Sequence, residues 1–375
     1  MADVAIAPHP FTTIKPNHGI GYVEVECIEK EFNTKCNPAH GFCIDGKRFV
    51  PVELMDVAGL VPGASEGKGL GNKFLDDLRQ ADAFIQIIDI AGMTDAEGRN
   101  VPEGSYDPAN DIRFLEEELN KWYYGILIKA WKSFARKTEM EGGNFAEAVA
   151  KQFSGLKIDE DQVKEVLRHI NFKENPSVWN ENQLMEFSAE LRKASKPMII
   201  AANKIDMKNG KANYERIVKQ YPDMKIVPCS ADSELALREA GKRGLINYIP
   251  GENKFTVTGE LSEGQIGALD NIQKNILDVY GSTGVQQILN GAVFDLLKYI
   301  AIFPASANRM KDSKGRTLPD CFLIPGGSTA LDFAFFLHTD FGKNFIRAID
   351  ARSKKALGKD YQLKNRDALE IVTGR

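Results

Sequence analysis

Three polar side chains follow an apolar run near the middle of the chain. The run occupies residues 197–202, and Asn203, Lys204 and Asp206 come after it. A short unbroken apolar run predicts a buried parallel strand, and ligands of open α/β sheets bind beyond the carboxyl ends of such strands. The Asp206 carboxylate can accept both N–H groups of a guanine edge, while Asn203 braces the loop and the Lys204 stem covers the base. Adenine lacks these paired donors, so the pattern favours GTP over ATP.

A lone Asn-Lys pair is most often part of a solvated turn, so the neighbouring motifs decide between the two interpretations. Residues 224–229 predict another strand, and Ser230 and Ala231 follow it directly. This order is typical of guanine-nucleotide sites, in which the backbone N–H of Ala231 would contact the guanine carbonyl. Two polar elements at two strand ends therefore predict one base-binding edge.

A third element contains a carboxylate and a glycine. Residues 20–27 alternate between apolar and polar side chains, and residues 49–55 predict the hairpin partner of that strand. Asp56 and Gly59 follow this partner as Asp-x-x-Gly. Asp56 would hold a Mg²⁺-bound water, and the flexible Gly59 backbone would offer its N–H to a γ-phosphate.

The elements that position these residues alternate between strand and helix. Residues 83–89 predict another buried strand, so we expect a doubly wound parallel α/β sheet. Residues 109–194 contain helical patterns only and predict a helical insertion, with its aromatic stripe in a helix-pair core. After residue 299, short strands around a helix at 331–337 predict a small β-grasp domain.

Composition limits the class of protein. The chain has 375 residues, 43% hydrophobic and 27% charged, which is ordinary for a globular protein of two or three domains. Residues 299–375 hold 13 Lys and Arg against 8 Asp and Glu, although the whole chain has a net charge of −4. A basic tail favours contact with RNA, and plain solubility explains it equally well. The basic run comprises Lys343, Arg347, Arg352, Lys354, Lys355, Lys359, Lys364 and Arg366.

Five unevenly spaced cysteines favour a reducing cytoplasm. Cys27, Cys36 and Cys43 lack the Cys-x-x-Cys spacing of structural zinc sites, so the sequence does not predict a metal site there, even with His18 and His40 nearby. No apolar run approaches the roughly 18 residues of a membrane span. We expect a cytoplasmic monomer without membrane contact.

Several segments together resemble one family. They are residues 11–14, 56–64, 69–75, 203–206 and 327–332. In this combination the chain resembles the Obg-related, YchF-type translation-associated GTPases in their archaeal form, over nearly its whole length. The resemblance implies GTP hydrolysis with Mg²⁺, association with the ribosome or RNA, and a C-terminal TGS domain of β-grasp fold. Relatives that lack Asn-Lys-x-Asp often prefer ATP, so its presence favours GTP.

The resemblance also assigns site residues and domains. Thr12 and Thr13 would lie in the first switch, and Thr13 would join Asp56 as a Mg²⁺ ligand, although two β-branched threonines between prolines are equally typical of a β-edge. Leu60 replaces a water-orienting glutamine, so no catalytic residue is assigned. The implied domains are 1–108 and 195–298 for the two parts of the GTPase, 109–194 for the insertion and 299–375 for the TGS domain.

One family element is missing from these 375 residues. The resemblance implies a central strand and a phosphate-binding loop, Gly-x-x-x-x-Gly-Lys-Ser/Thr, before the first switch, and the sequence contains no such motif. Without it the chain lacks a backbone N–H cradle, the phosphate lysine and one Mg²⁺ ligand, so nucleotide binding is expected to be impaired. We interpret Met1 as an internal methionine of a longer GTPase, to be tested by the DNA upstream.

Two other functions fit parts of the sequence. A ribosome- or RNA-binding module without nucleotide competence would use the insertion and the basic tail, and its binding would depend on salt. A dinucleotide-dependent oxidoreductase is excluded because no Gly-x-Gly-x-x-Gly follows a predicted strand.

Overall fold

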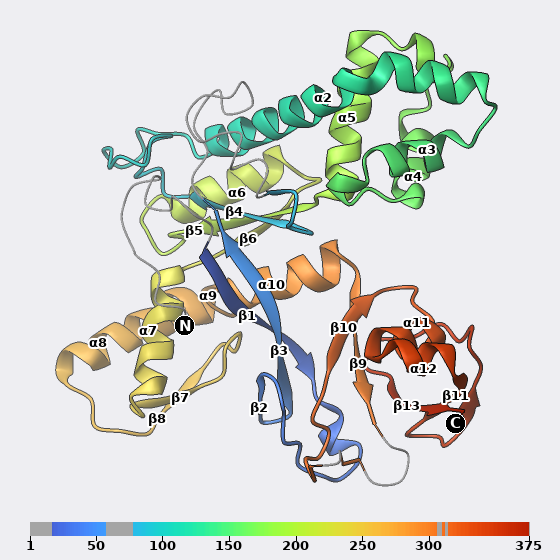
Figure 1. Cartoon of the computed structure of the whole chain (residues 1–375). Helices are drawn as coiled ribbons and strands as arrows, with labels where there is room; N and C mark the ends of the chain where they lie inside the picture. Colours follow the sequence, from blue (N-terminus) through green and yellow to red (C-terminus); the bar gives the residue numbers. More distant parts are fainter. Residues whose placement is uncertain (1–16, 58–77, 306–309, 312–313, 375) are drawn as a thin grey trace. The chain divides into compact units, whose positions relative to one another are not determined.

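The computed structural model describes residues 17–57, 78–305, 310, 311 and 314–374 (Figure 1). These residues form two compact units, and each is described by itself. The first contains residues 17–19 and 55–288, and the second contains residues 20–54 and the chain from 289 onwards. The domain boundaries expected at 108, 194 and 298 follow the order of the elements in sequence and stay a prediction.

A parallel sheet forms the centre of the first unit. It consists of β4 (Phe84–Asp89), β5 (Met198–Asn203) and β6 (Lys225–Pro228), in that order. Helices α6 (Gly210–Gln220) and α7 (Ala231–Lys242) follow β5 and β6. The apolar runs are buried as expected, and the parallel α/β fold is confirmed.

Four helices lie between β4 and β5 in sequence. They are α2 (Ala109–Met140), α3 (Phe145–Gln152), α4 (Glu160–Ile170) and α5 (Glu181–Ser195), with two short 3₁₀ turns at Ser154–Leu156 and Pro176–Val178. Trp131 is 2% exposed and stacks on Trp179 with ring centroids 5.5 Å apart. The aromatic stripe is therefore helix core, as predicted, because burial leaves no ring face for a base.

The first unit continues beyond α7 with a hairpin and a helical stretch. The hairpin pairs β7 (Ile246–Tyr248) with β8 (Phe255–Val257). Helix α8 (Glu263–Ile272) passes through a π-helical turn (Gln273–Leu277) into α9 (Asp278–Tyr280). A break at 281–284 precedes α10 (Val285–Asn290), within which the first unit ends at Ile288. A second π-helical turn (Gly291–Leu296) follows and belongs to the second unit.

The second unit contains two sheets. In the first, β3 (Lys47–Asp56) lies between β1 (Asn17–Glu26) and β2 (Phe42–Ile44), so the predicted pairing of β1 with β3 is confirmed, but the hairpin partner of β3 is β2. A 3₁₀ turn (Ile28–Lys30) begins the connection from β1 to β2. Buried Val23, Val25 and Val50 of these strands share a core with Phe303 and Ala368 of the second sheet.

The second sheet has the order β10-β9-β13-β11-β12. Its strands are β9 (Tyr299–Pro304), β10 (Phe322–Pro325), β11 (Phe345–Asp350), β12 (Ala356–Leu357) and β13 (Ala368–Thr373). Helices α11 (Ala330–Leu337) and α12 (Thr339–Lys343) follow β10. Strand β13 pairs with β9 in parallel, and the other pairs are antiparallel. The β-grasp prediction is confirmed, although the sequence did not predict β11 and β12.

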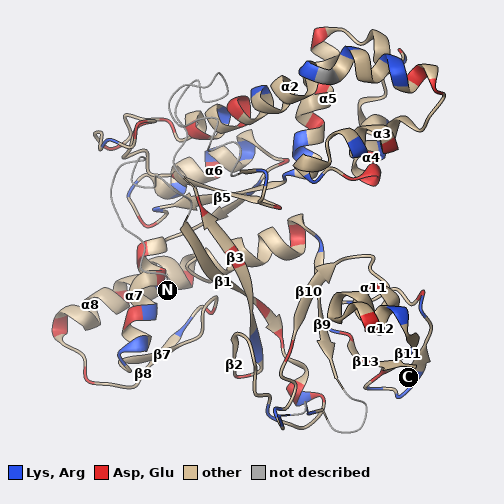
Figure 2. Ribbon diagram, viewed as in Figure 1, with Lys and Arg blue, Asp and Glu red and all other residues tan. Residues whose placement is uncertain are grey.

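Charges are mixed along both units. Figure 2 shows Lys and Arg residues with Asp and Glu residues among them, on α2 as well as on the C-terminal elements. Of the helices that the structure describes, none combines the length and the apolar character that crossing a membrane requires.

Candidate nucleotide-binding site

The Asn-Lys-x-Asp segment leaves β5 through a tight turn. Asn203 is the last residue of the strand, and Lys204 takes a left-handed conformation with φ of 63°. The N–H of Ile205 donates to the Cys229 carbonyl over 3.1 Å, and the N–H of Met207 donates to Lys204 over 3.0 Å. Left-handed backbone is uncommon for a residue with a side chain and concentrates at functional turns.

Asn203 connects two predicted elements. Its Oδ1 accepts the N–H of Ala231 over 3.0 Å, which joins the end of β5 to the start of α7. Ser230 caps this helix, since its hydroxyl accepts the N–H of Ser233. The structure therefore brings Asn203, Ser230 and Ala231 together. The predicted contact of Ala231 with a guanine carbonyl requires its N–H to be shared between two acceptors.

The Asp206 carboxylate is exposed at this edge of the sheet, whereas the Lys204 ammonium is paired with a carboxylate. Asp206 is exposed, as a carboxylate that receives a ligand must be. Lys204 Nζ lies 2.7 Å from Asp89 Oδ2, at the end of the neighbouring strand. Asp89 also accepts from the N–H of Ala91 and the hydroxyl of Thr94, each over 3.0 Å. The ammonium of Lys204 is thus anchored, and its stem is held at the strand ends.

Sequence reasoning did not assign Asp89 to the site. The signal was present, because Asp89 ends a strand parallel to β5 and is registered with Asn203. Carboxyl ends of parallel strands meet at one edge of a sheet.

A buried carboxylate on α7 stabilises the segment that contains Ser230 and Ala231. Glu234 on α7 is 4% exposed and accepts hydrogen bonds from the hydroxyls of Thr283 over 2.6 Å and Tyr248 over 2.8 Å. Arg238 pairs with its other oxygen. Burial, with the nearby Glu234 charge, raises the pKa of Tyr248 above its usual range, so this phenol remains a donor. Burial likewise raises the pKa of Cys229 to about 12, which keeps that thiol protonated.

The loop at 281–284 approaches the Ser230 segment closely. The N–H of Ser230 donates to the Thr283 carbonyl over 2.9 Å. Gly284 has a φ of +86°, and a Cβ placed on it would lie 2.0 Å from the Pro228 carbonyl oxygen. Only glycine fits here. No local pattern in the sequence indicated the contact of this loop with the Ser230 segment.

The phosphate side is only partly described. Asp56 is the last residue of β3 and is exposed. Thr12, Thr13, Gly59 and Leu60 lie outside the described residues. A carboxylate at a strand end suits Mg²⁺, which prefers oxygen ligands. The assignment of Thr13 and Asp56 as metal ligands stays a prediction.

Within the described residues, β4 is an edge strand. It pairs with β5 on one side, and the sheet continues only toward β6. Ile87, in the middle of β4, is 70% exposed. Parallel strands are normally covered on both faces, so the exposed Ile87 is unusual for a strand of such a sheet.

Comparisons with known proteins agree with this geometry. Residues 201–306 match the family described as Obg-like GTPase YGR210-like, G4 motif-containing domain, and residues 311–373 match the TGS domain. An uncharacterized GTP-binding protein of Methanocaldococcus jannaschii is 48% identical over 98% of this chain and 92% of its own length.

Two further matches concern the fold and the wider family. The crystal structure of a GTP-binding protein from Pyrococcus horikoshii has a TM-score of 0.76 and 37% identity, covering 96% of this chain and 93% of that one. The ribosome-binding ATPase YchF of Bacillus subtilis is 27% identical over 93% of this chain and 82% of its own length.

Proposed function

Because the chain belongs to the Obg-like, YchF-type GTP-binding proteins with a C-terminal TGS domain, we propose that it binds and hydrolyses GTP in association with the ribosome. The guanine would be read by Asn203, Lys204, Asp206, Ser230 and Ala231. The bond from Ala231 to Asn203 carries this proposal, because it holds two sequence-distant elements as one base-binding edge.

Each residue of the edge would have a separate task. The exposed Asp206 carboxylate would accept the two N–H donors of guanine, which adenine does not offer in this arrangement. Lys204, anchored on Asp89, would lay its methylene stem against the base. Asp56 would hold Mg²⁺, which when bound neutralises charge on the phosphates. The described residues include no assigned group for orienting the attacking water.

The phosphate end limits what residues 1–375 can do. They contain no Gly-x-x-x-x-Gly-Lys-Ser/Thr motif, and we expect a chain of these residues alone to bind nucleotide poorly. The test is GTP binding, with Mg²⁺, by residues 1–375 and by a chain extended upstream to include the motif. Tight binding by the shorter chain would contradict our account of the phosphate site.

Asp206→Asn tests the base-reading assignment in the version that binds nucleotide. An amide cannot accept both guanine N–H groups and leaves donors facing each other, so GTP affinity should fall about a hundredfold. XTP should bind better than GTP, because xanthine has a carbonyl where guanine has its amino group. Asp223→Asn is the matched control: it removes an equal charge from another exposed carboxylate of this unit. Equal GTP binding by the two variants would remove Asp206 from the site.

The proposed association with the ribosome is supported by the similarity to the ribosome-binding ATPase YchF of Bacillus subtilis and by the basic tail. Co-sedimentation of the chain with ribosomes tests it, with and without GTP and over a range of salt. Ribosome binding that depends on salt but never on nucleotide would favour the alternative of a nucleotide-incompetent RNA-binding module. Absence of binding at low salt would contradict both versions.

A further inference from the structure

Three thiols and one carboxylate meet in the second unit, at the connection between β1 and β2. Cys27 follows β1, Glu29 lies in the 3₁₀ turn, Cys36 lies in the loop and Cys43 is the middle residue of β2. Their ligand atoms all lie within 4.8 Å of one another. The intervals of nine and seven residues gave no zinc pattern in the sequence, because the fold of this loop creates the cluster.

The distances fit a tetrahedral metal site. The Cys27 and Cys36 sulfurs are 3.7 Å apart, and the Cys43 sulfur lies 3.8 Å from Glu29 Oε1. Zinc bonded to two sulfurs at about 2.3 Å separates them by about 3.8 Å in a tetrahedron. A disulfide would require about 2.05 Å. The sulfurs therefore lie where a metal would hold them and not where they would bond to each other.

Backbone contacts orient the four ligands. The N–H of Cys27 donates to the Gly46 carbonyl over 2.7 Å, and Cys43 is paired with Arg48 of β3. Glu29 Oε2 accepts the N–H of Cys36 over 2.8 Å, which turns its other oxygen toward Cys43. Such hydrogen bonds are typical of the groups that orient metal ligands.

The surroundings also favour a soft divalent cation. Cys27 is 2% exposed, and the other three ligands are half-buried at the margin of the unit's hydrophobic core. Thiolates select zinc over magnesium or calcium.

We propose that Cys27, Glu29, Cys36 and Cys43 bind one structural Zn²⁺. Four protein ligands complete a tetrahedron and leave no position for substrate, so the ion would stabilise the fold and would not act in catalysis. Binding would release the thiol protons to solvent, with no change of oxidation state.

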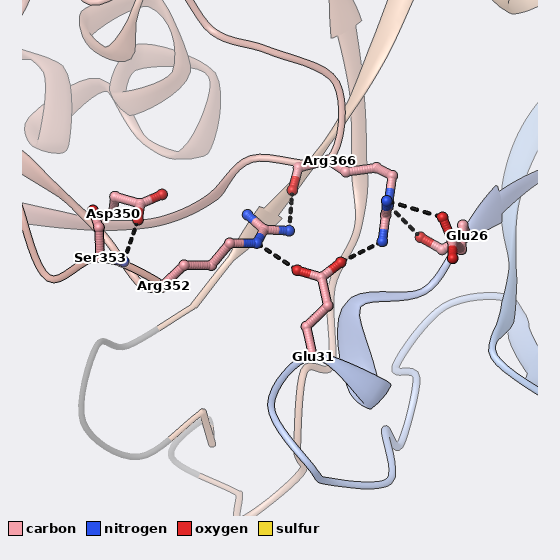
Figure 3. Close-up of polar contacts among 6 residues, drawn as sticks. All are labelled: Glu26, Glu31, Asp350, Arg352, Ser353 and Arg366. Atoms are coloured by element: carbon pink, nitrogen blue, oxygen red, sulfur yellow. Dashed lines mark hydrogen bonds and ion pairs between the residues drawn. The ribbon is translucent and has the colours of Figure 1, made fainter.

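The metal would fix a loop that attaches the hairpin to the β-grasp sheet within the same unit. Glu31, two residues after Glu29, accepts hydrogen bonds from Arg352 and Arg366 (Figure 3). The N–H of Asn37, next to Cys36, donates to the Thr317 carbonyl over 2.8 Å. Zinc would close the chain between Cys27 and Cys43 around these attachments.

Metal analysis of the full chain, purified without chelators, tests the proposal. We expect about one zinc per chain in the wild type and less than about a tenth of that in Cys36→Ala and Cys43→Ala. Cys321→Ala is the control, because this buried cysteine belongs to the same unit but lies outside the cluster. Glu29→Gln should weaken zinc binding at least about tenfold.

A second measurement guards against misfolded variants. Wild-type chain stripped of metal and titrated with Co²⁺ should develop the thiolate-to-cobalt charge-transfer absorption of a tetrahedral site. A chelator should lower the melting temperature of the wild type and leave that of Cys36→Ala unchanged. The proposal is overturned if the wild type binds neither zinc nor cobalt, if Cys36→Ala retains full zinc, or if Cys27 and Cys36 form a disulfide.

Discussion

Glu234 and Glu31 each accept hydrogen bonds that hold a loop, one in each compact unit, but Glu234 is buried and Glu31 is partly exposed. The Glu234 side chain is 5% exposed and accepts from two hydroxyls and an arginine. The Glu31 side chain is 34% exposed, and its two arginine partners are about equally accessible. Removal of a buried carboxylate leaves its donors unsatisfied and out of reach of water, whereas water and salt ions replace a carboxylate that is removed from an exposed position. The proposed base-reading segment should therefore depend on Glu234 far more than the hairpin loop depends on Glu31.

A matched pair of glycines gives the largest expected effect. Gly284 and Gly327 have nearly equal φ values, +86° and +84°, but a Cβ on Gly284 meets the Pro228 carbonyl oxygen whereas nothing lies within 4 Å of one on Gly327. Gly284→Ala should lower the free energy of unfolding by about 4 kcal/mol, since the backbone next to Ser230 must shift. Gly327→Ala should cost only about 1 kcal/mol of left-handed strain. Denaturant titration measures the free energy of unfolding of both variants. Equal losses would show that the backbone around Gly284 and Pro228 shifts without cost to admit the methyl group.

Removal of the buried carboxylate should have the next largest effect. Glu234→Ala leaves Thr283, Tyr248 and Arg238 without their shared acceptor, at a cost of about 3 kcal/mol. Nucleotide affinity should fall with it, because the loop at 281–284 contacts Ser230. Glu239→Ala, a half-buried carboxylate on the same helix, is the control. Thermal and denaturant unfolding measure the stability of both variants. Equal losses of stability in Glu234→Ala and Glu239→Ala would contradict the special role of the buried carboxylate.

A smaller change isolates a single bond. Thr283→Val preserves the shape of the side chain but removes the hydroxyl that donates to Glu234. The remaining donors keep the carboxylate satisfied in part, so the loss should be about 1.5 kcal/mol. A double-mutant cycle with Glu234→Ala measures the coupling. Additive losses would mean that the bond contributes nothing of its own.

Glu31→Ala should have the smallest effect, no more than about 1 kcal/mol. Its arginine partners are a quarter to a third exposed, so salt should screen the interaction. Unfolding in low and high salt measures this, with the difference from wild type shrinking as salt rises. If Glu31→Ala lost as much unfolding free energy as Glu234→Ala, the buried and the exposed carboxylate would not differ in their contribution to stability.

The sequence predicted the parts of the site that lie on the chain as short patterns. Asn203, Asp206, Ser230 and Ala231 directly follow apolar runs, so their position at strand ends could be read without coordinates. The support behind them could not be predicted. Glu234 and Thr283 are separated by 49 residues, and no periodicity links two such positions.

The fold shows the same division. Unbroken apolar runs predicted β4 and β5, whereas β11 has exposed Ile346 and Arg347 next to each other before buried Ala348, so it shows no alternation that would identify a strand. The cysteine cluster was also missed, because its order is created by turns within one loop. Local patterns predict elements, but contacts between distant segments require the folded chain.

Helix α2 has a mechanical consequence. Its 32 residues form a rod about 48 Å long. The first turn is tied to the central sheet, where Gln86 of β4 donates to the Asp111 carbonyl over 2.8 Å. The Trp131 end carries the aromatic cluster with Trp179. A tilt of about 5° at the sheet would move the far tip by about 4 Å, so a small displacement of the first turn would be much larger at the Trp131 end.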